Sequence, residues 1–298
     1  MIKNFFDTNK IEYLENTSLK KYNTYRIDTF CKYLVFPKTK SELIEILKEI
    51  NTHKIKFYIL GNGSNVIFSM KYYDGVIIKL DKLNHITYKN DLLTVEAGYS
   101  LIKLAIETIE KSLSGLEFAA GIPGQVGAST AMNAGAYNSD MSSVVKEVEV
   151  LSIKDNYQIK TLSNQELNYS YRNSILKNNP NLIVLSTTFE LHSGDKDEMK
   201  LQIETRRNKR IASQPLNLPS AGSVFRNPEN MYAGALIEQC NLKGYDINGA
   251  EVSQKHANFI VNKGGASGED IIKLIKKIQD EVKLKNNVEL KLEQIIIE

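Results

Sequence analysis

Two short segments of the chain combine glycine with small polar residues, a composition that lets backbone approach and bind phosphate. The first reads Gly61-Asn62-Gly63-Ser64-Asn65. Glycine allows a ligand to come close, and successive amide N–H groups, with the Ser64 and Asn65 side chains, can bind phosphate oxygens. The spacing is not Gly-x-Gly-x-x-Gly, and a strand-like stretch follows at 66–68, which disfavours a Rossmann site. A plain hairpin turn explains the segment equally well.

The second segment is longer and continues into a run of small residues: Gly121-Ile122-Pro123-Gly124-Gln125-Val126-Gly127-Ala128, then Asn133-Ala134-Gly135-Ala136-Tyr137. Pro123 fixes φ and Gly124 permits a turn, so a short helix is predicted to begin directly after them. The start of such a helix can bind a diphosphate, and Asn133, Gly135 and Ala136 could lie against a flat ring. A tightly packed turn between helices is the alternative. Two such segments together predict a dinucleotide bound between them.

Hydrophobic periodicity predicts the elements that position these segments. A strand at 33–36, a helix at 39–50 and a strand at 57–60 form a βαβ unit that ends in the first segment. Thr39 and Glu42 have the spacing of a capping box. Further strands are expected at 76–80, 92–97, 148–153, 182–191, 258–261 and 288–297. Further helices are expected at 101–112, 196–213 and 232–240, and after Ser267 with the apolar stripe Ile271, Leu274, Ile275, Ile278 and Val282.

Composition narrows the class of protein. The 298 residues include 38 basic and 35 acidic side chains, a balance that argues against a nucleic-acid-binding protein. No apolar stretch approaches the ~20 residues that span a membrane. Residues 1–20 lack the apolar core of a signal peptide, so we expect a cytoplasmic protein. The four histidines and two cysteines show no metal-ligand spacing, and we expect no metal.

Together with Asn23-Thr24-Tyr25-Arg26, the two glycine segments resemble the UDP-N-acetylenolpyruvoylglucosamine reductase (MurB) family of flavoproteins. The resemblance continues through a Tyr-Arg motif, Tyr169-Ser170-Tyr171-Arg172-Asn173-Ser174, and a Ser motif, Ser220-Ala221-Gly222-Ser223-Val224-Phe225-Arg226-Asn227-Pro228. It extends to Lys255-His256-Ala257-Asn258-Phe259 and to the stretch at 288–297. The chain is similar to the shorter subtype of the family, which lacks a substrate-capping loop.

The resemblance implies a catalytic trio of Arg172, Ser223 and Glu293. Hydride addition to an enolpyruvyl double bond develops negative charge that a guanidinium stabilises, and the resulting enolate can take a proton from a well-placed hydroxyl. Glu293 would orient this site, and Glu289 is a weaker alternative at even spacing on the same predicted strand. Taken singly, Arg172 could be a surface cation stacked on Tyr171. Likewise, Ser223 could be a turn residue and Glu293 an exposed strand residue.

Further side chains are implied as contacts of a UDP-sugar or of NADPH: Tyr171, Arg210, Arg226, Asn227 and His256. Arg210 belongs to a basic cluster with Arg206, Arg207 and Lys209. Phosphates require such cations, but a solvated helix face explains at least two of the four. For His256, a place in the core or on the surface is the alternative.

For the whole chain the resemblance implies an α+β fold. After a lead segment at 1–19, it implies an FAD-binding domain of the PCMH, vanillyl-alcohol-oxidase-like type at 20–193. A smaller α+β substrate-binding domain at 194–298 would return its last strand to the active site. The implied enzyme, a UDP-N-acetylmuramate dehydrogenase, uses non-covalent FAD and NADPH to reduce UDP-N-acetylglucosamine enolpyruvate in peptidoglycan precursor synthesis.

The expected partners are therefore small molecules, the UDP-sugar enolpyruvyl ether and NADPH, with neither nucleic acid nor membrane among them, and we expect a monomer. Two alternatives stay open. One is an FAD oxidase of the same fold, although neither glycine segment contains a histidine that could tether a flavin. The other is a non-catalytic nucleotide-binding module, which would not require the catalytic trio.

Overall fold

The chain folds into two units, each assembled from separate stretches of sequence. The structure, a computed structural model, describes residues 2–89 and 92–298. The first unit contains the residues up to Leu14, Leu34–Gly61 and Val76–Arg207, and the second contains Glu15–Tyr33, Asn62–Gly75 and Asn208–Glu298. These units follow backbone contacts, whereas the expected ranges 1–19, 20–193 and 194–298 follow binding roles, and those ranges stay a prediction.

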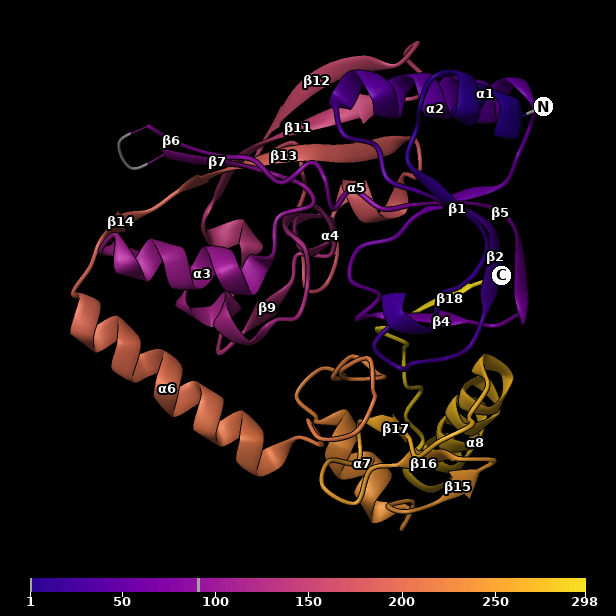
Figure 1. Ribbon diagram of the computed structural model, residues 1–298. Helices are drawn as coiled ribbons and strands as arrows, with labels where there is room; N and C mark the ends of the chain where they lie inside the picture. Colours follow the sequence, from indigo (N-terminus) through magenta and orange to yellow (C-terminus); the bar gives the residue numbers. More distant parts are fainter. Residues whose placement is uncertain (1, 90–91) are drawn as a thin grey trace. The chain divides into compact units, whose positions relative to one another are not determined.

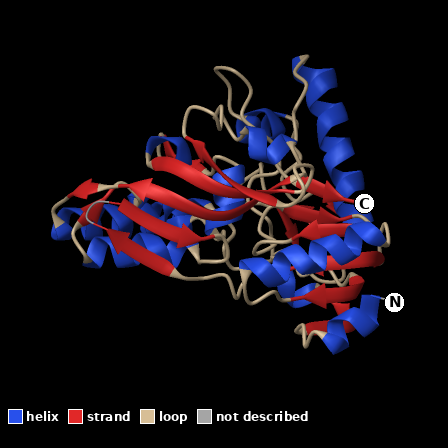
Figure 2. Cartoon of the chain, turned by 90° about the horizontal axis from the view of Figure 1, so that it is seen from above, coloured by secondary structure: helices blue, strands red, loops and turns tan. Residues whose placement is uncertain are grey.

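A five-stranded antiparallel sheet forms the centre of the first unit, and its strands lie side by side as one layer (Figures 1 and 2). Its order is β12-β11-β13-β7-β6, from β6 (Ile86–Lys89), β7 (Leu92–Glu96), β11 (Val145–Ser152), β12 (Gln158–Ser163) and β13 (Leu182–Glu190). Residues 183–187 of the central strand β13 are all buried, which is why this strand reads as an unbroken apolar and small-residue run. The expected strands at 92–97, 148–153 and 182–191 are confirmed.

The helices of the first unit are α1 (Ile2–Thr8), α2 (Lys40–Thr52), α3 (Leu101–Glu110), α4 (Val126–Ala131) and α5 (Ile175–Asn178). α2 buries Leu43, Ile46, Leu47 and Ile50. At its start the Thr39 hydroxyl accepts a hydrogen bond from the Glu42 N–H at 3.1 Å. The Glu42 carboxylate accepts from the Lys38 N–H instead of the Thr39 N–H, so only half of the predicted capping box forms. α1 falls inside the segment taken as a lead, where it buries Ile2 and Phe6.

Short elements complete the first unit. They are β3 (Phe57–Ile59), β8 (Leu113–Ser114), β9 (Gly135–Ala136), β10 (Ser139–Asp140), β14 (His192–Ser193) and the 3₁₀ turns η2 (Glu117–Gly121) and η3 (Met141–Ser143). β9 and β10 form a hairpin that places Gly135 opposite Asp140. α4 is the short helix that was predicted to begin after Gly124. It packs against β13 and β7.

Four elements run from one unit into the other: β1 (Tyr13–Ser18), β2 (Phe30–Val35), β5 (Tyr72–Ile78) and α6 (Lys196–Ser213). The three strands and β3 have the sheet order β1-β2-β5-β3, with β3 parallel to β5. α6 has the predicted bounds, and Met199 is its only buried residue. Within residues 2–89 and 92–298, no helix combines the length and apolar character that crossing a bilayer requires.

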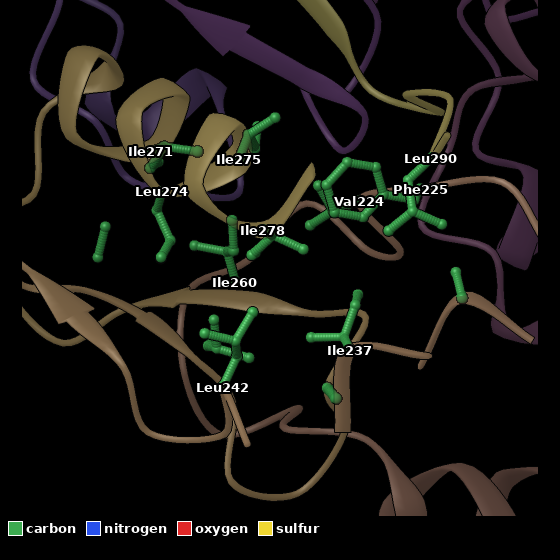
Figure 3. Close-up of a cluster of buried hydrophobic side chains, with 14 of the residues drawn as sticks. Val224, Phe225, Ile237, Leu242, Ile260, Ile271, Leu274, Ile275, Ile278 and Leu290 are labelled. Atoms are coloured by element: carbon green, nitrogen blue, oxygen red, sulfur yellow. The ribbon is translucent and has the colours of Figure 1, made fainter. Parts of the chain in front are cut away.

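The second unit is built around α8 (Gly268–Asn286), which begins with a complete capping box between Ser267 and Asp270. The predicted stripe of α8 is buried, and Figure 3 shows Ile271, Leu274 and Ile278 together with Ile260 and Leu242 in one apolar cluster. The other elements of this unit are η1 (Lys20–Tyr22), β4 (Val66–Phe68), α7 (Ala233–Gln239), β15 (Asp246–Ile247), β16 (Ala250–Val252), β17 (Ile260–Asn262) and β18 (Ile295–Ile297).

The predicted strand at 288–297 is wrong in extent, because only Ile295–Ile297 forms a strand, β18, parallel to β4. The residues before it bond to the Ser motif without a regular ladder. The Arg226 N–H donates to the Lys291 carbonyl and the Glu293 N–H donates to the Val224 carbonyl, both at 2.9 Å. Since these bonds go to an irregular segment, the alternation of apolar residues over 288–294 does not report a strand face.

Candidate active site

The predicted site residues divide between the two units. The first unit contains Gly61, Gly121, Ile122, Pro123, Gly124, Gly127, Ala128, Asn133, Gly135, Ala136, Tyr171 and Arg172. The second contains Asn62, Gly63, Ser64, Asn65, Arg210, Ser223, Arg226, Asn227, His256 and Glu293. The boundary between the two units therefore falls within the first glycine segment, at the peptide bond between Gly61 and Asn62.

In the first unit, Gly61 lies against the start of α4. A Cβ at Gly61 would come within 3.1 Å of the Ala128 Cβ, so glycine permits a close approach of the two predicted segments. The Gly61 carbonyl accepts a hydrogen bond from the Lys79 ammonium at 2.6 Å. Lys79 also pairs with Asp81 at 3.2 Å, and Asp81 accepts from the Gln125 amide at 2.5 Å. This polar chain joins the first glycine segment to the second.

Lys79 is a buried cation that the sequence reasoning missed. Its side chain is only 4% exposed, and burial lowers the pKa of the ammonium, an effect that the negative charge of Asp81 opposes. The one available signal was a lysine inside an otherwise apolar run, 76–80. Charged side chains in such runs are rarely buried without a specific partner.

The turn into α4 is fixed by backbone bonds. The Val126 N–H donates to the Tyr99 carbonyl and the Gly127 N–H donates to the Ala97 carbonyl, both at 2.9 Å. A Cβ at Gly127 would lie 2.6 Å from the Ala97 Cβ, so this position requires glycine. The first N–H groups of α4 thus bond within the protein, and phosphate binding here would have to use other donors than these two.

The Tyr-Arg motif forms a tight turn beside the end of α4. Ser170 and Asn173 exchange two backbone hydrogen bonds of 3.0 Å, and Arg172 adopts a left-handed φ of 56° within the turn. The Arg172 guanidinium donates to the Gly135 carbonyl at 2.5 Å and also lies over the Tyr171 ring, 5.1 Å from its centroid. The stacked arrangement is therefore present together with a bond to the second glycine segment. Non-glycine residues in this backbone region are often functional.

Two buried polar atoms have no hydrogen-bonding partner in the described part of the chain. They are the Tyr169 hydroxyl and the Arg226 Nε. Burial, and next the charge of Asp140, raise the pKa of Tyr169 well above its usual value, so the hydroxyl stays protonated. Such atoms are rare in native proteins, and a bound polar ligand would satisfy them. In the first unit, the glycine segments around Gly61 and Gly127 and the Tyr169 hydroxyl fit a cofactor with phosphate and ring groups.

In the second unit, the rest of the first glycine segment is tied to two distant motifs. The Thr24 N–H donates to the Gly63 carbonyl at 3.1 Å. Gly63 has a φ of 64°, and a Cβ there would lie 2.7 Å from the Asn23 Cα, so only glycine fits. The Asn65 amide donates to the Glu293 carbonyl at 3.2 Å, and the Ile295 N–H donates to the Asn65 carbonyl at 2.9 Å. The segment is therefore not the plain hairpin turn that the sequence left open.

Ser223 and Glu293 lie on neighbouring segments of the second unit. The residue after Ser223, Val224, accepts a backbone bond from the Glu293 N–H at 2.9 Å. The Gln294 amide donates to the carbonyls of Ala221 and Gly222 at 3.0 and 3.3 Å. The structure thus places the segments that carry two members of the predicted trio next to each other.

The competing carboxylate, Glu289, lies elsewhere. Its side chain is 77% exposed and pairs with Lys283 at 3.6 Å. This surface pair leaves Glu293 as the glutamate beside the Ser motif. Asn258, 4% exposed, supports the same motif by exchanging hydrogen bonds of 3.0 and 2.8 Å with the Phe225 backbone. Sequence reasoning missed Asn258 and Gln294 because a buried amide leaves no mark on hydrophobic periodicity.

Some predicted substrate contacts have roles within the fold. The Asn227 side chain accepts a hydrogen bond from the Ala233 N–H, the first of α7, at 3.1 Å. His256 Nδ1 accepts from the Asn258 N–H at 3.2 Å, and burial lowers the pKa of the imidazole. Arg210 donates from Nε to the Gln214 side chain at 3.1 Å, while Tyr171 is half exposed. In the basic cluster, Arg206 lies over the Tyr137 ring at 4.8 Å.

Comparison with known protein families identifies the chain as a flavin-binding oxidoreductase. Residues 31–160 match the FAD binding domain, which confirms FAD as the predicted cofactor and, with the mixed helices and sheets described above, the predicted fold class. Residues 214–297 match the C-terminal domain of UDP-N-acetylenolpyruvoylglucosamine reductase. Among the described residues, no cluster of three His, Cys, Asp or Glu side chains could hold a metal ion.

Curated relatives that this chain matches over nearly their whole length carry the same name. The UDP-N-acetylenolpyruvoylglucosamine reductase of Caldanaerobacter subterraneus is 43% identical, over 92% of this chain and 90% of the relative. That of Clostridium botulinum strain Alaska E43 is 40% identical, over 100% of this chain and 96% of the relative. The crystal structure of the MurB enzyme from Thermus caldophilus has a TM-score of 0.81 at 30% identity, covering 97% of this chain and 99% of that one. The chain belongs to the UDP-N-acetylenolpyruvoylglucosamine reductase family, as predicted.

Proposed function

We propose that the chain catalyses the NADPH-dependent, FAD-mediated reduction of UDP-N-acetylglucosamine enolpyruvate to UDP-N-acetylmuramate in peptidoglycan precursor synthesis. The observation that carries the proposal is the backbone bond between the Glu293 N–H and the carbonyl of Val224, the residue after Ser223, because it places the segments that carry Ser223 and Glu293 side by side. This arrangement occurs in a chain that matches enzymes named as reductases of this substrate over nearly its full length.

The glycine segments would hold FAD, which when bound would supply the chemistry of hydride transfer from NADPH to the terminal carbon of the enolpyruvyl double bond. The protein's own residues provide position and charge. Arg172 stabilises the negative charge that develops on the substrate carboxylate and the adjacent carbon. Its guanidinium is already oriented by the Gly135 carbonyl, which limits the reorganisation required in the transition state.

Ser223 completes the addition by giving its hydroxyl proton to the carbon next to the carboxylate, so that one hydride and one proton saturate the double bond. Glu293 orients the site through the segment it shares with the Ser motif. UDP-sugar contacts would come from Tyr171, Arg210, Arg226, Asn227 and His256. The ranges 20–193 for the FAD-binding domain and 194–298 for the substrate-binding domain belong to the same proposal, as do a monomeric state and a place in the cytoplasm.

An absorbance experiment tests the function. The purified protein should show flavin bands that bleach on addition of NADPH and recover, without oxygen, when the enolpyruvyl sugar nucleotide is added. A colourless protein that takes up no FAD would remove the proposal. Bands that recover promptly in air and never respond to the sugar nucleotide would instead identify an FAD oxidase of the same fold.

A further inference from the structure

We infer that Asn133 is a positioning residue that acts through Arg172, and that its side chain holds the turn on which this arginine is presented to the substrate. The inference rests on the proposed function, because it assigns Asn133 to the step in which Arg172 takes part. Asn133 was predicted from the sequence as a direct contact of the flavin, and its surroundings support a different role.

The Asn133 side chain is buried and fully engaged with the protein. It is 1% exposed. Its Nδ2 donates to the Asp140 carboxylate at 3.1 Å and to the Ser170 carbonyl at 3.0 Å, while its Oδ1 accepts from the Ser142 N–H at 2.9 Å. The partners fix the orientation of the amide, since both groups facing Nδ2 are acceptors and the group facing Oδ1 is a donor.

The Ser170 carbonyl is the entry to the turn that carries Arg172. Ser170 and Asn173 close this turn by two backbone bonds, so a group that fixes Ser170 also fixes the base of the turn. The Arg172 guanidinium reaches the Gly135 carbonyl, two residues beyond Asn133. The short stretch 133–135 therefore bonds to both the backbone turn and the side chain of Arg172. Asn133 bonds to the turn at Ser170, and the Gly135 carbonyl accepts from the guanidinium.

Asp140 stabilises the arrangement from the opposite side. It lies across from Gly135 in the hairpin of β9 and β10, and its second carboxylate oxygen accepts from the Ser142 N–H at 3.1 Å and hydroxyl at 2.5 Å. The carboxylate is thus held in place as the acceptor for Asn133. Charge-assisted bonds of this kind are stronger than neutral ones, which makes Asn133 a rigid link between the hairpin and the turn.

Asn133 can be removed without straining the backbone. Its φ is 46°, a left-handed conformation that asparagine tolerates and glycine adopts freely. The substitution N133G therefore deletes the amide and its three bonds but keeps the conformation of the chain. A matched control exists in Asn156, which has a φ of 52° and is exposed, so N156G makes the same chemical change where no such link is present.

The experiment measures the two half-reactions separately by anaerobic stopped-flow absorbance. In N133G we expect the FAD content and the rate of flavin reduction by NADPH to stay within about twofold of the native enzyme. Reoxidation by the enolpyruvyl sugar nucleotide should slow by about tenfold or more, because small displacements of a stabilising group cost large factors in rate. N156G should leave both rates unchanged. If N133G does not fold, D140N, which removes one bond of the link, should slow the same half-reaction several-fold.

A double-mutant cycle separates positioning from a general loss of structure. If Asn133 acts through Arg172, adding N133G to an R172K enzyme should slow reoxidation by less than about twofold, since the target of the positioning is already lost. Fully multiplicative effects of N133G and R172K would overturn the inference. Loss of FAD from purified N133G would also overturn it, and would restore the predicted flavin contact. Failure of the proposed function would be distinct, because the native flavin would then not respond to NADPH or to the sugar nucleotide.

Discussion

The Arg172 turn and the Ser223 segment, one in each unit, are held in place by different forces. The turn is fixed by polar side chains that bond to backbone: Asn133 to Ser170, and Ser174 to the Ala131 carbonyl at 2.6 Å. Ser223 is followed by Val224 and Phe225, each 1% exposed, which anchor the segment in the apolar cluster of Figure 3. The first arrangement depends on directional bonds and the second mainly on packing, so each should be sensitive to a different kind of substitution.

The largest effect should come from S223A, which removes the proposed proton donor while the buried neighbours keep the segment in place. Product formation should fall by about 10²–10⁴-fold, the usual contribution of a general acid. Single-turnover measurements should show flavin reduction by NADPH at the native rate. Unimpaired turnover of S223A would remove Ser223 from the mechanism. The Ser223 segment would then have no side chain that takes part in proton transfer.

The next largest effect concerns stability. F225A deletes a fully buried ring and should lower the free energy of unfolding by about 3–5 kcal/mol. S174A, its counterpart beside the Arg172 turn, deletes a buried hydroxyl and should cost about 1–2 kcal/mol. Urea unfolding of the two variants checks the contrast. Equal losses would show that packing and directional bonds do not divide between the two regions as described.

A smaller effect is expected at Lys79, which joins the two glycine segments by directional bonds. K79M keeps the apolar stem but removes the bond to the Gly61 carbonyl, and FAD affinity should weaken about tenfold, the effect of one lost charge-assisted bond. Fluorescence titration of the apoprotein with FAD measures it. K82M is the matched control, since Lys82 is about half exposed and pairs with the surface carboxylate of Glu12 at 3.5 Å. Equal losses of affinity in both variants would contradict the role of the buried link.

The smallest effect should be a pH dependence from His256. Burial lowers the pKa of this imidazole, Lys243 lowers it further and Glu238 opposes the change. Below the unfolded pKa of about 6.5, the unfolded chain then binds more protons than the folded one, so stability falls as the pH falls through this range. Thermal unfolding between pH 5 and 7 should show a shallower dependence in H256Q. An unchanged slope would assign the acid sensitivity to other groups.

Local sequence patterns predicted the features that depend on residues close together in the chain, such as helix starts and apolar helix faces. The apolar stripe of α8 and the start of α4 follow from spacing alone, and the structure has both. The stretch at 288–297 was misread because its bonds go to the Ser motif far away in the chain. Lys79, Asn133 and Asn258 act through partners that only the fold supplies. Periodicity does not report such partners, and only the resemblance of motifs placed Arg172, Ser223 and Glu293 in one mechanism.

The pairing of β4 with β18 has a consequence for how the protein is made. Gly63 and Asn65 precede β4, but Asn65 is held by Glu293 and Ile295, and Glu293 is synthesised 228 residues after Asn65. During translation these partners therefore cannot hold the glycine loop until the long stretch of chain between them has been made. Such long-range closure is slow. A nascent chain arrested before Ile295 would contain all of the loop residues 61–65 but would lack the Ile295 N–H that bonds to the Asn65 carbonyl.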